Sequence, residues 1–294
     1  MSELFLPTAD FRRKKRDEYL SLGGRIGIGT IGRSILSEPI DVYKIGKGKR
    51  TSLIIGAHHA MEYISASALY DLIDFFLLNE TRGGTYCGMD IPYLLSLVSF
   101  YIVPCLNPDG VDMHLNAARV SPLRERQIRM NGGSNDFSQW QANARGVDLN
   151  HNYDFRFSEY KRVEREQGIV AGRSKYSGEH PESEPEARSL ASFVRALTPD
   201  TVISLHAQGG EVFFMPRTAP VQRKAEMFCK KVGYKASTPT DTATYGGFVD
   251  YTGGVLKIPS FTVELGRGKN PLPEEAYPAI REIVRTAAIL LSLY

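Results

Sequence analysis

The stretch SLIIGAHHAMEYISASALYDLIDFFLL, residues 52–78, decides the fold class of this chain. Residues 52–56 form a short apolar run that ends at a glycine, which is typical of a buried strand. Residues 61–78 repeat apolar side chains at the spacing of one helix face. His59 and Glu62 lie between these two elements, three residues apart, so both side chains can face one point. The stretch therefore predicts a strand, a turn and a helix, with two polar side chains at the carboxyl end of the strand, where sites of open α/β sheets usually lie.

The alternation of strand and helix patterns continues along the chain. Further buried strands are predicted near residues 97–103, 201–206 and 260–264, and further helices near residues 184–197, 219–232 and 274–292. Residues 1–22 are predicted to form a leading helix or arm, and residues 23–49 strands joined by turns. Residues 104–182 are polar and irregular, and we expect them to form a rim around a cleft. We therefore expect one α/β domain with a mixed, mostly parallel, twisted sheet and helices on both faces.

The composition is that of an ordinary globular protein. Of the 294 residues, 42% are hydrophobic and 10% aromatic, and the net charge of +3 is too small to indicate a nucleic-acid partner. The three cysteines, Cys87, Cys105 and Cys229, are odd in number and widely spaced, which favours free thiols in a reducing compartment. Residues 1–22 contain no apolar run of signal-peptide length, and no stretch reaches the roughly 18 apolar residues of a membrane span. We expect a cytoplasmic protein without a membrane span.

Two more polar side chains follow predicted strands. His206 ends the apolar run 203–205, and Glu264 follows the run 260–263. Most lone histidines are surface or satisfied core residues, and a His-x-x-Glu pair often arises by chance. Here, however, each of these residues follows a short apolar run that is predicted to be a buried strand. Two histidines and one carboxylate form the three-ligand set of a catalytic zinc ion, and another carboxylate supplies a base for water. The hypothesis is one zinc ion per chain, held by His59, Glu62 and His206, with Glu264 as the general base.

Five motifs in a fixed order give the chain a resemblance to the carboxypeptidase A-like zinc metallopeptidases. They are GAHHAME (56–62), NPDG (107–110), GVDLN (146–150), SLH (204–206), and GGFVDY (246–251) followed by SFTVE (260–264). The resemblance implies a zinc carboxypeptidase-like fold, with residues 23–294 as the catalytic domain. It also implies zinc-dependent hydrolysis of an amide bond.

The resemblance assigns roles to two further residues. Asp148 matches an aspartate that accepts a hydrogen bond from the first zinc histidine, and ligating histidines generally need such a partner; the alternative is an aspartate that caps a turn. Arg126 lies where the family carries an arginine that stabilises the tetrahedral oxyanion. Other arginines compete for this role: Arg119, Arg124 and Arg129.

The expected substrate pocket departs from the family pattern. Asn150 is followed by His151, where carboxypeptidases of the family have an arginine, so the fork that holds a terminal carboxylate is lost unless another residue such as Arg145 replaces it. Thr242 occupies the position of the family's pocket tyrosine, and Tyr245 is close enough to substitute for it. Val249, at the specificity position, offers no charge.

Three segments are similar to bacterial γ-D-glutamyl-diaminopimelate peptidases, which cleave cell-wall stem peptides. They are GAHHAME (56–62), WQANARG (140–146) and NHNY (150–153). The implied substrate is a peptidoglycan-derived peptide. Since Val249 carries no charge, contacts to the diamino acid are expected from the 104–182 rim, with Asn150 and His151 nearest. The alternatives are an ordinary zinc metallocarboxypeptidase, an N-acyl amino-acid deacylase and, least favoured because the ligands and Glu264 are intact, a non-catalytic peptidoglycan-binding protein.

Overall fold

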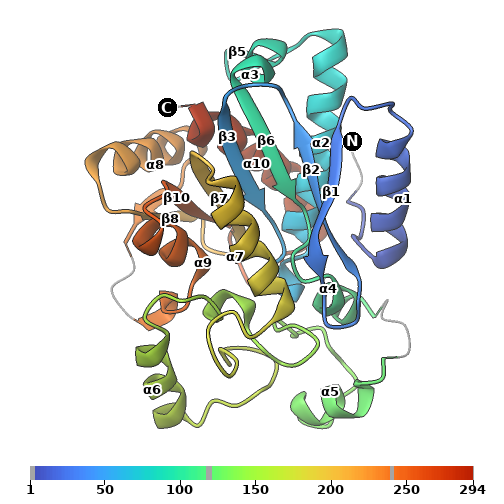
Figure 1. Ribbon diagram of the computed structural model, residues 1–294, viewed down its shortest axis with the longest axis vertical. Helices are drawn as coiled ribbons and strands as arrows, with labels where there is room; N and C mark the ends of the chain where they lie inside the picture. The colour runs from blue at the N-terminus through green and yellow to red at the C-terminus, as the bar shows by residue number, and fades with distance from the viewer. Residues whose placement is uncertain (1–3, 117–120, 239–241, 294) are drawn as a thin grey trace.

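A twisted sheet of eight strands forms the centre of the computed structural model, which describes residues 4–116, 121–238 and 242–293 (Figure 1). The strand order is β1-β2-β6-β3-β7-β10-β8-β9. The strands are β1 (Gly27–Arg33), β2 (Pro39–Ile45), β3 (Arg50–Ile55), β6 (Val98–Val103), β7 (Thr201–Ala207), β8 (Glu211–Met215), β9 (Lys235–Ser237) and β10 (Ser260–Leu265). β3 pairs in parallel with β6 and β7, β7 with β10, and β8 with β9, whereas the other pairs are antiparallel. The expected mixed, mostly parallel sheet is confirmed.

Helices cover both faces of this sheet. They are α1 (Ala9–Leu20), α2 (Ile64–Arg82), α3 (Ile91–Leu97), α4 (Pro108–His114), α5 (Arg124–Met130), α6 (Phe157–Gln167), α7 (Pro185–Leu197), α8 (Ala219–Val232), α9 (Phe248–Asp250) and α10 (Tyr277–Leu293). α2, α8 and α10 pack on one face in the largest core cluster, while α7 and α9 pack on the other (Figure 1). A separate hairpin joins β4 (Thr85–Tyr86) to β5 (Met89–Asp90).

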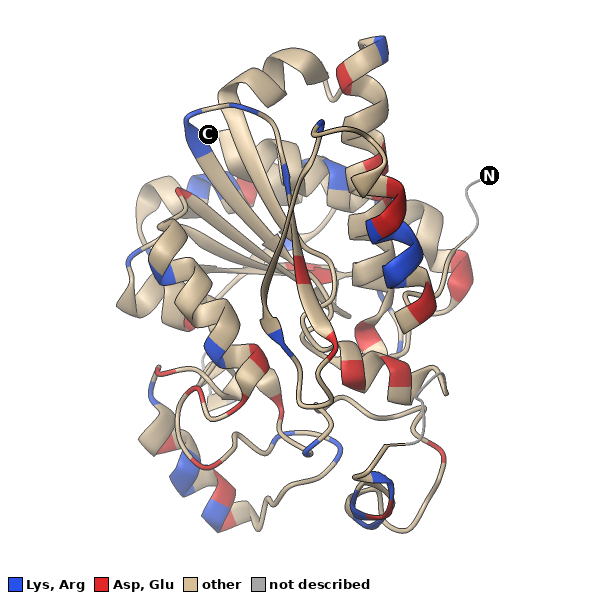
Figure 2. Cartoon of the chain, turned by 45° about the vertical axis from the view of Figure 1, so that its right-hand side comes forward, with Lys and Arg blue, Asp and Glu red and all other residues tan. Residues whose placement is uncertain are grey.

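The central strands are buried on both faces because each face has its own helical layer. In β3, Ile54 enters the cluster with α2 and α10, and its neighbours Leu53 and Ile55 enter the cluster with α7. All seven residues of β7 are buried. Figure 2 shows the charged residues concentrated on helices and loops, with few on the central strands. None of the helices in the described part of the chain is long and apolar enough to cross a lipid bilayer.

The rim is more regular than expected. Residues 104–182 contain three helices, α4, α5 and α6, so the prediction of an irregular stretch is wrong there. α4 and α5 have seven residues each, too few to show a helical period. α6 buries only Phe157, Tyr160 and Glu164, so its polar face dominates its sequence. β8 and β9 also went unpredicted, because they are short strands of five and three residues.

Asn107, the residue before α4, joins the rim to the strand exits. Its side-chain oxygen accepts a hydrogen bond from the Gly110 backbone N–H at 3.1 Å, which caps the helix. Its amide nitrogen donates to the backbone carbonyls of His58 at 3.2 Å and Ala142 at 3.0 Å. The Ala60 N–H also donates to the Gln141 carbonyl at 2.9 Å. The segment around residue 141 is therefore held against the loop that carries His59.

A buried ion pair attaches α1 to α4, and α4 packs against the 3-10 turn Ala60–Glu62. Arg12 donates from both terminal nitrogens to the two carboxylate oxygens of Asp112, at 3.0 and 2.9 Å. The Ala9 backbone N–H donates to the same carboxylate at 3.0 Å. Both charged side chains are buried, so each depends on the other to offset its loss of hydration.

We predict that Asp112→Ala lowers the free energy of unfolding by roughly 3–5 kcal/mol, because the buried Arg12 guanidinium loses its bidentate carboxylate and keeps only the Pro7 carbonyl at 2.7 Å and the more distant Glu38 at 3.6 Å. Urea unfolding followed by circular dichroism measures this change. The control is Glu125→Ala, which removes an exposed partner 3.9 Å from Arg129 and should change the free energy by less than about 1 kcal/mol. A comparable loss in both variants would contradict the prediction.

Candidate metal centre

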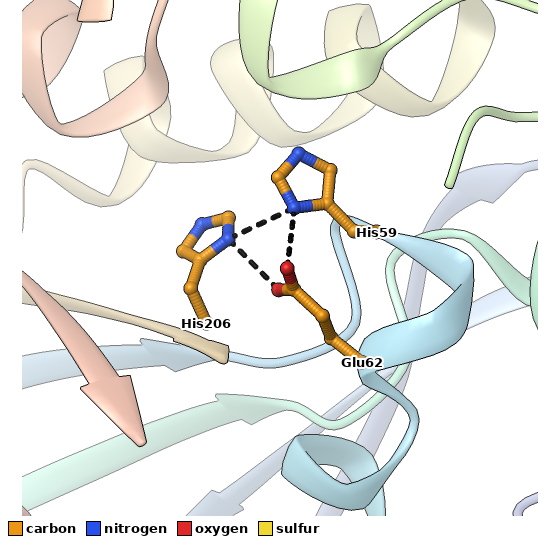
Figure 3. Close-up of side chains that lie close together, drawn as sticks. All are labelled: His59, Glu62 and His206. Carbon is orange, nitrogen blue, oxygen red and sulfur yellow. Dashed lines mark hydrogen bonds and ion pairs between the residues drawn. The ribbon is translucent and has the colours of Figure 1, made fainter. Parts of the chain in front are cut away.

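The three predicted ligands meet at one edge of the sheet (Figure 3). His59 follows β3, Glu62 ends the 3-10 turn before α2, and His206 belongs to β7. β3 and β7 are parallel neighbours, with Ile55 beside Ser204, so their carboxyl ends lie together. The His59 Nδ1 atom lies 3.0 Å from Glu62 Oε1, and His206 Nδ1 lies 3.1 Å from Glu62 Oε2. The two Nδ1 atoms are 3.3 Å apart.

This donor set fits a zinc ion. The three residues are at most 8% exposed, and their donor atoms point at one another. In a tetrahedral site with ligand distances of about 2.0–2.2 Å, donor atoms lie about 3.3–3.6 Å apart, close to the separations of 3.0–3.3 Å found here. Two imidazole nitrogens and a carboxylate oxygen leave a fourth position for water or substrate.

Asp148 lies on the far side of the His59 ring. Its Oδ1 accepts a hydrogen bond from His59 Nε2 at 3.1 Å, and its Oδ2 accepts from Gln141 Nε2 at 3.2 Å and from the Lys175 backbone N–H at 3.0 Å. A proton on Nε2 leaves the Nδ1 lone pair free for a metal. Asp148 also caps the 3-10 turn Leu149–His151 through the Asn150 N–H at 3.2 Å, so both roles considered for it coexist in the geometry.

The second imidazole has a chain of buried partners. His206 Nε2 lies 3.2 Å from Ser204 Oγ, which lies 3.4 Å from His58 Nδ1, and His58 Nε2 lies 3.2 Å from the Tyr153 hydroxyl. Burial and the neighbouring histidines hold the pKa of His58 well below its usual value, so the ring is neutral. His206 can therefore donate from Nε2 to Ser204, which donates to His58, and this leaves His206 Nδ1 facing the cluster.

Opposite charges in contact favour the ionised forms of Glu62 and His59. Burial alone would raise the pKa of Glu62, but the two histidines outweigh it and lower that pKa to about 2. Burial alone would lower the pKa of His59, but the carboxylates of Glu62 and Asp148 raise it well above its usual value. Such a site exchanges protons for a metal cation readily, because the cation replaces the positive charge that the carboxylates favour.

Glu264 lies beside the cluster on β10. The strand register places it next to His206 on β7 and opposite Glu211 on β8. Burial raises the pKa of Glu264 to about 8, and the negative charges of Glu62 and Glu211 add to this rise. A bound cation would favour the carboxylate and lower this pKa, which suits a group that exchanges a proton near neutral pH.

One cavity of about 560 Å³ joins most of the predicted residues. The three predicted ligands, Glu264, Asn150, His151 and Val249 all line it.

His151 is held firmly at the wall of this cavity: its Nδ1 donates to the Tyr245 carbonyl at 2.7 Å, and its ring stacks on Tyr160 with the ring centroids 4.1 Å apart. Gly246 has a φ of +75°, and a Cβ there would lie 2.2 Å from the His151 carbonyl oxygen, so only glycine permits this close approach.

Arg126 and Tyr245 are not brought to this cavity. Arg126 lines a separate cavity of about 220 Å³ together with Arg145. The Tyr245 hydroxyl accepts a hydrogen bond from Arg156 at 2.7 Å, and Tyr245 is not among the described lining residues. Their roles at the oxyanion and in the pocket remain predictions.

The structure does not place the competing arginines in this cavity either. The Arg124 guanidinium packs over the Phe137 ring at 4.6 Å, and Arg129 lies on the surface near Glu125. Arg119 lies outside the described residues. Among the described residues that line the larger cavity there is thus no arginine.

Two acidic residues of the cavity were not predicted. Glu211, at the start of β8, and Asp250, in α9, both line it. The expectation that charged contacts come from the 104–182 rim is therefore incomplete, because these carboxylates lie outside it. Asp250 was visible in the GGFVDY motif, but Glu211 depends on a strand too short to recognise from its sequence.

Comparison with known sequences places the chain among peptidases. The chain is 32% identical over 255 residues to the γ-D-glutamyl-L-diamino acid endopeptidase 1 of Lysinibacillus sphaericus, an alignment that covers 85% of this chain and 63% of that protein. The chain thus spans less than two thirds of that relative's length. It is also 29% identical over 190 residues to carboxypeptidase B2 of Rattus norvegicus, covering 63% of this chain and 40% of that protein.

Solved structures agree on the fold. Thrombin-activatable fibrinolysis inhibitor superposes with a TM-score of 0.76 at 20% identity, covering 97% of this chain and 73% of that one. The murein-tripeptide amidase MpaA of Escherichia coli O157 superposes with a TM-score of 0.55 at 19% identity, covering 90% and 91%. Residues 23–288 match the family described as zinc carboxypeptidase. The chain therefore belongs to the zinc carboxypeptidase family.

Proposed function

We propose that this protein is a zinc-dependent peptidase that hydrolyses the γ-D-glutamyl–diamino acid bond of peptidoglycan stem peptides. The observation that carries the catalytic part is the convergence of His59, Glu62 and His206 on one point, with the Glu264 carboxylate in the same cavity. When bound there, zinc acts as a Lewis acid that makes a water molecule nucleophilic near neutral pH and polarises the substrate carbonyl.

The chain's own residues supply the proton transfers and the positioning. Glu264 takes a proton from the attacking water and returns it to the amine that leaves when the C–N bond breaks. Asp148 holds His59 with its Nδ1 toward the metal, and Ser204 does the same for His206. Arg126 lines the separate cavity, and this position lends no support to its predicted role at the oxyanion.

The substrate assignment is supported by two observations. The relative from Lysinibacillus sphaericus bears the name of this activity. In this chain His151 stands where the resemblance leads one to expect an arginine, and Arg145, the other candidate for the fork, pairs with Glu184 at 3.0 Å at the separate cavity. Without a guanidinium fork, a terminal carboxylate gains no bidentate contact. The site then suits a peptide that is recognised by other groups.

A cytoplasmic location is part of this proposal. The cysteines Cys105 and Cys229 are buried and unpaired, which suits a reducing compartment. Stem peptides released from the wall, or their precursors, would be the substrates available there.

We predict about one zinc ion per chain after dialysis, measured by elemental analysis. His206→Ala should lose most of it, because the site then retains only two protein ligands. His180→Ala, which removes an exposed histidine, is the control and should keep the metal. Full zinc content in His206→Ala would refute the ligand assignment.

Glu264→Gln should retain zinc but lower kcat by roughly 10²–10⁴-fold, since the amide preserves the shape and removes the proton transfer. Steady-state kinetics together with elemental analysis test this. Glu275→Gln, at an exposed position, should leave kcat unchanged. Near-normal turnover by Glu264→Gln would exclude a role as general base.

The substrate prediction concerns L-Ala-γ-D-Glu-diaminopimelate. We expect kcat/KM for this peptide to exceed that for a blocked L-dipeptide at least about tenfold, or roughly 1.4 kcal/mol. His151→Arg restores a guanidinium near Asn150 and should shift the preference toward ordinary C-terminal residues. Equal kcat/KM values in the wild type, read by mass spectrometry of products, would instead favour a metallocarboxypeptidase.

A further inference from the structure

We infer that Glu211 is a specificity residue that binds the side-chain ammonium group of the substrate's diamino acid. This inference rests on the proposed function and deepens it, because it names the chemical group by which the cavity selects its substrate. The resemblance to carboxypeptidases directs attention to Val249 for side-chain recognition, but Val249 carries no charge. The charge lies elsewhere, on strand β8 at Glu211.

The strand register places Glu211 on the cavity wall beside the catalytic centre. Glu211 is directly opposite Glu264 in the antiparallel pair of β8 and β10, and Glu264 is beside His206 in the parallel pair of β10 and β7. Opposed residues of neighbouring strands carry their side chains on the same face of a sheet. Glu211 is thus one strand spacing, about 4.8 Å, beyond Glu264 on the side away from His206.

The Glu211 carboxylate has no hydrogen-bond or ion-pair partner within the described ranges 4–116, 121–238 and 242–293, and the side chain is half-buried. Arg267, whose side chain lies over Gly210, forms no ion pair with it among the described contacts and donates to the Gly233 carbonyl at 2.8 Å. Gly209 leaves room for the side chain: a Cβ there would lie 3.3 Å from Glu211 Oε1 and 3.2 Å from Glu264 Cβ. A half-buried carboxylate without a partner gains most from a cationic ligand.

The other charged groups of the cavity point to the same ligand. Asp250 is the second unassigned carboxylate, but it is hydrogen-bonded by Thr244 and lies in the field of Arg156 and Arg217. Among the described lining residues there is no lysine or arginine, so a substrate side chain that carries a negative charge alone would meet two carboxylates and no guanidinium or ammonium, whereas an ammonium group meets the Glu211 carboxylate.

The wall next to Glu211 suits the carbon chain of such a side chain. Phe213 and Thr262 are the next opposed pair along β8 and β10 on the same face, and both line the cavity with Val249. A methylene chain can lie against Phe213 and Val249 while its terminal ammonium meets Glu211. This arrangement separates apolar packing from charge recognition, as is usual for long cationic side chains.

The test compares two peptides that differ only in the ammonium group, γ-D-glutamyl-L-lysine and γ-D-glutamyl-L-norleucine, each blocked in the same way. We expect the wild type to prefer the lysine peptide, and Glu211→Gln to lower the lysine-to-norleucine ratio of kcat/KM about tenfold to a hundredfold. The ratio is the readout because Glu211 faces Glu264, so losing its charge affects the base equally for both peptides. Glu275→Gln should leave the ratio unchanged.

A binding measurement makes the result independent of turnover. Free L-lysine should inhibit the wild type more strongly than L-norleucine, and Glu211→Gln should abolish this difference even if its catalysis is impaired. An unchanged ratio and unchanged inhibition in Glu211→Gln would overturn the inference. So would a ratio that collapses in Asp250→Asn but persists in Glu211→Gln.

An error in the proposed function would give a result different from an error in the role of Glu211. If γ-D-glutamyl peptides are not cleaved but blocked L-dipeptides are, the bond assignment is wrong. The same lysine-to-norleucine comparison in the L-dipeptide series then still tests Glu211.

Discussion

The parallel pairing of β3 with β7 is the constraint on which the rest of this molecule depends. The register that sets Ile55 beside Ser204 brings together two chain segments that are almost 150 positions apart. Both strands end at the same edge, so His59, in the turn after β3, and His206, near the end of β7, share a point in space. Shifting either strand by one residue would turn its side chains to the opposite face and separate the imidazoles. The helices that bury both sheet faces therefore also protect the geometry of the site.

The sequence predicted the residues whose positions depend on local strand patterns, and it failed for residues whose positions depend on tertiary packing. His59, Glu62, His206 and Glu264 follow apolar runs, and the ends of buried strands can be recognised locally. Arg126 was placed by its distance along the chain from the NPDG turn. Its direction depends on how the short helix α5 packs, and that packing is a tertiary property. Tyr245 was likewise placed by sequence proximity, but its hydroxyl is turned to Arg156.

Short strands, and the strands with which they pair, could not be predicted from the sequence. Glu211 is conspicuous only once β8 is known to run antiparallel to β10, because that register sets its side chain beside Glu264. Five residues reading Glu-Val-Phe-Phe-Met show no clear alternation of polar and apolar positions, so neither the strand nor its orientation could be inferred. His58 shows a related limit: its neutral state and its place between Ser204 and Tyr153 follow from three separate segments.

Parts of the 104–182 segment differ in how firmly they are attached to the metal ligands, and Asn107 supplies one of the attachments. Its amide fixes the loop before His59 to residue 142, and Asp148 fixes the next turn to His59 itself. The exposed residues 132–136, which lie between α5 and the buried Phe137, have no such attachment to the ligands among the contacts described. Lengthening a surface connection costs little conformational entropy. Extra residues inserted there would therefore lengthen the surface of the rim while the metal ligands keep their positions.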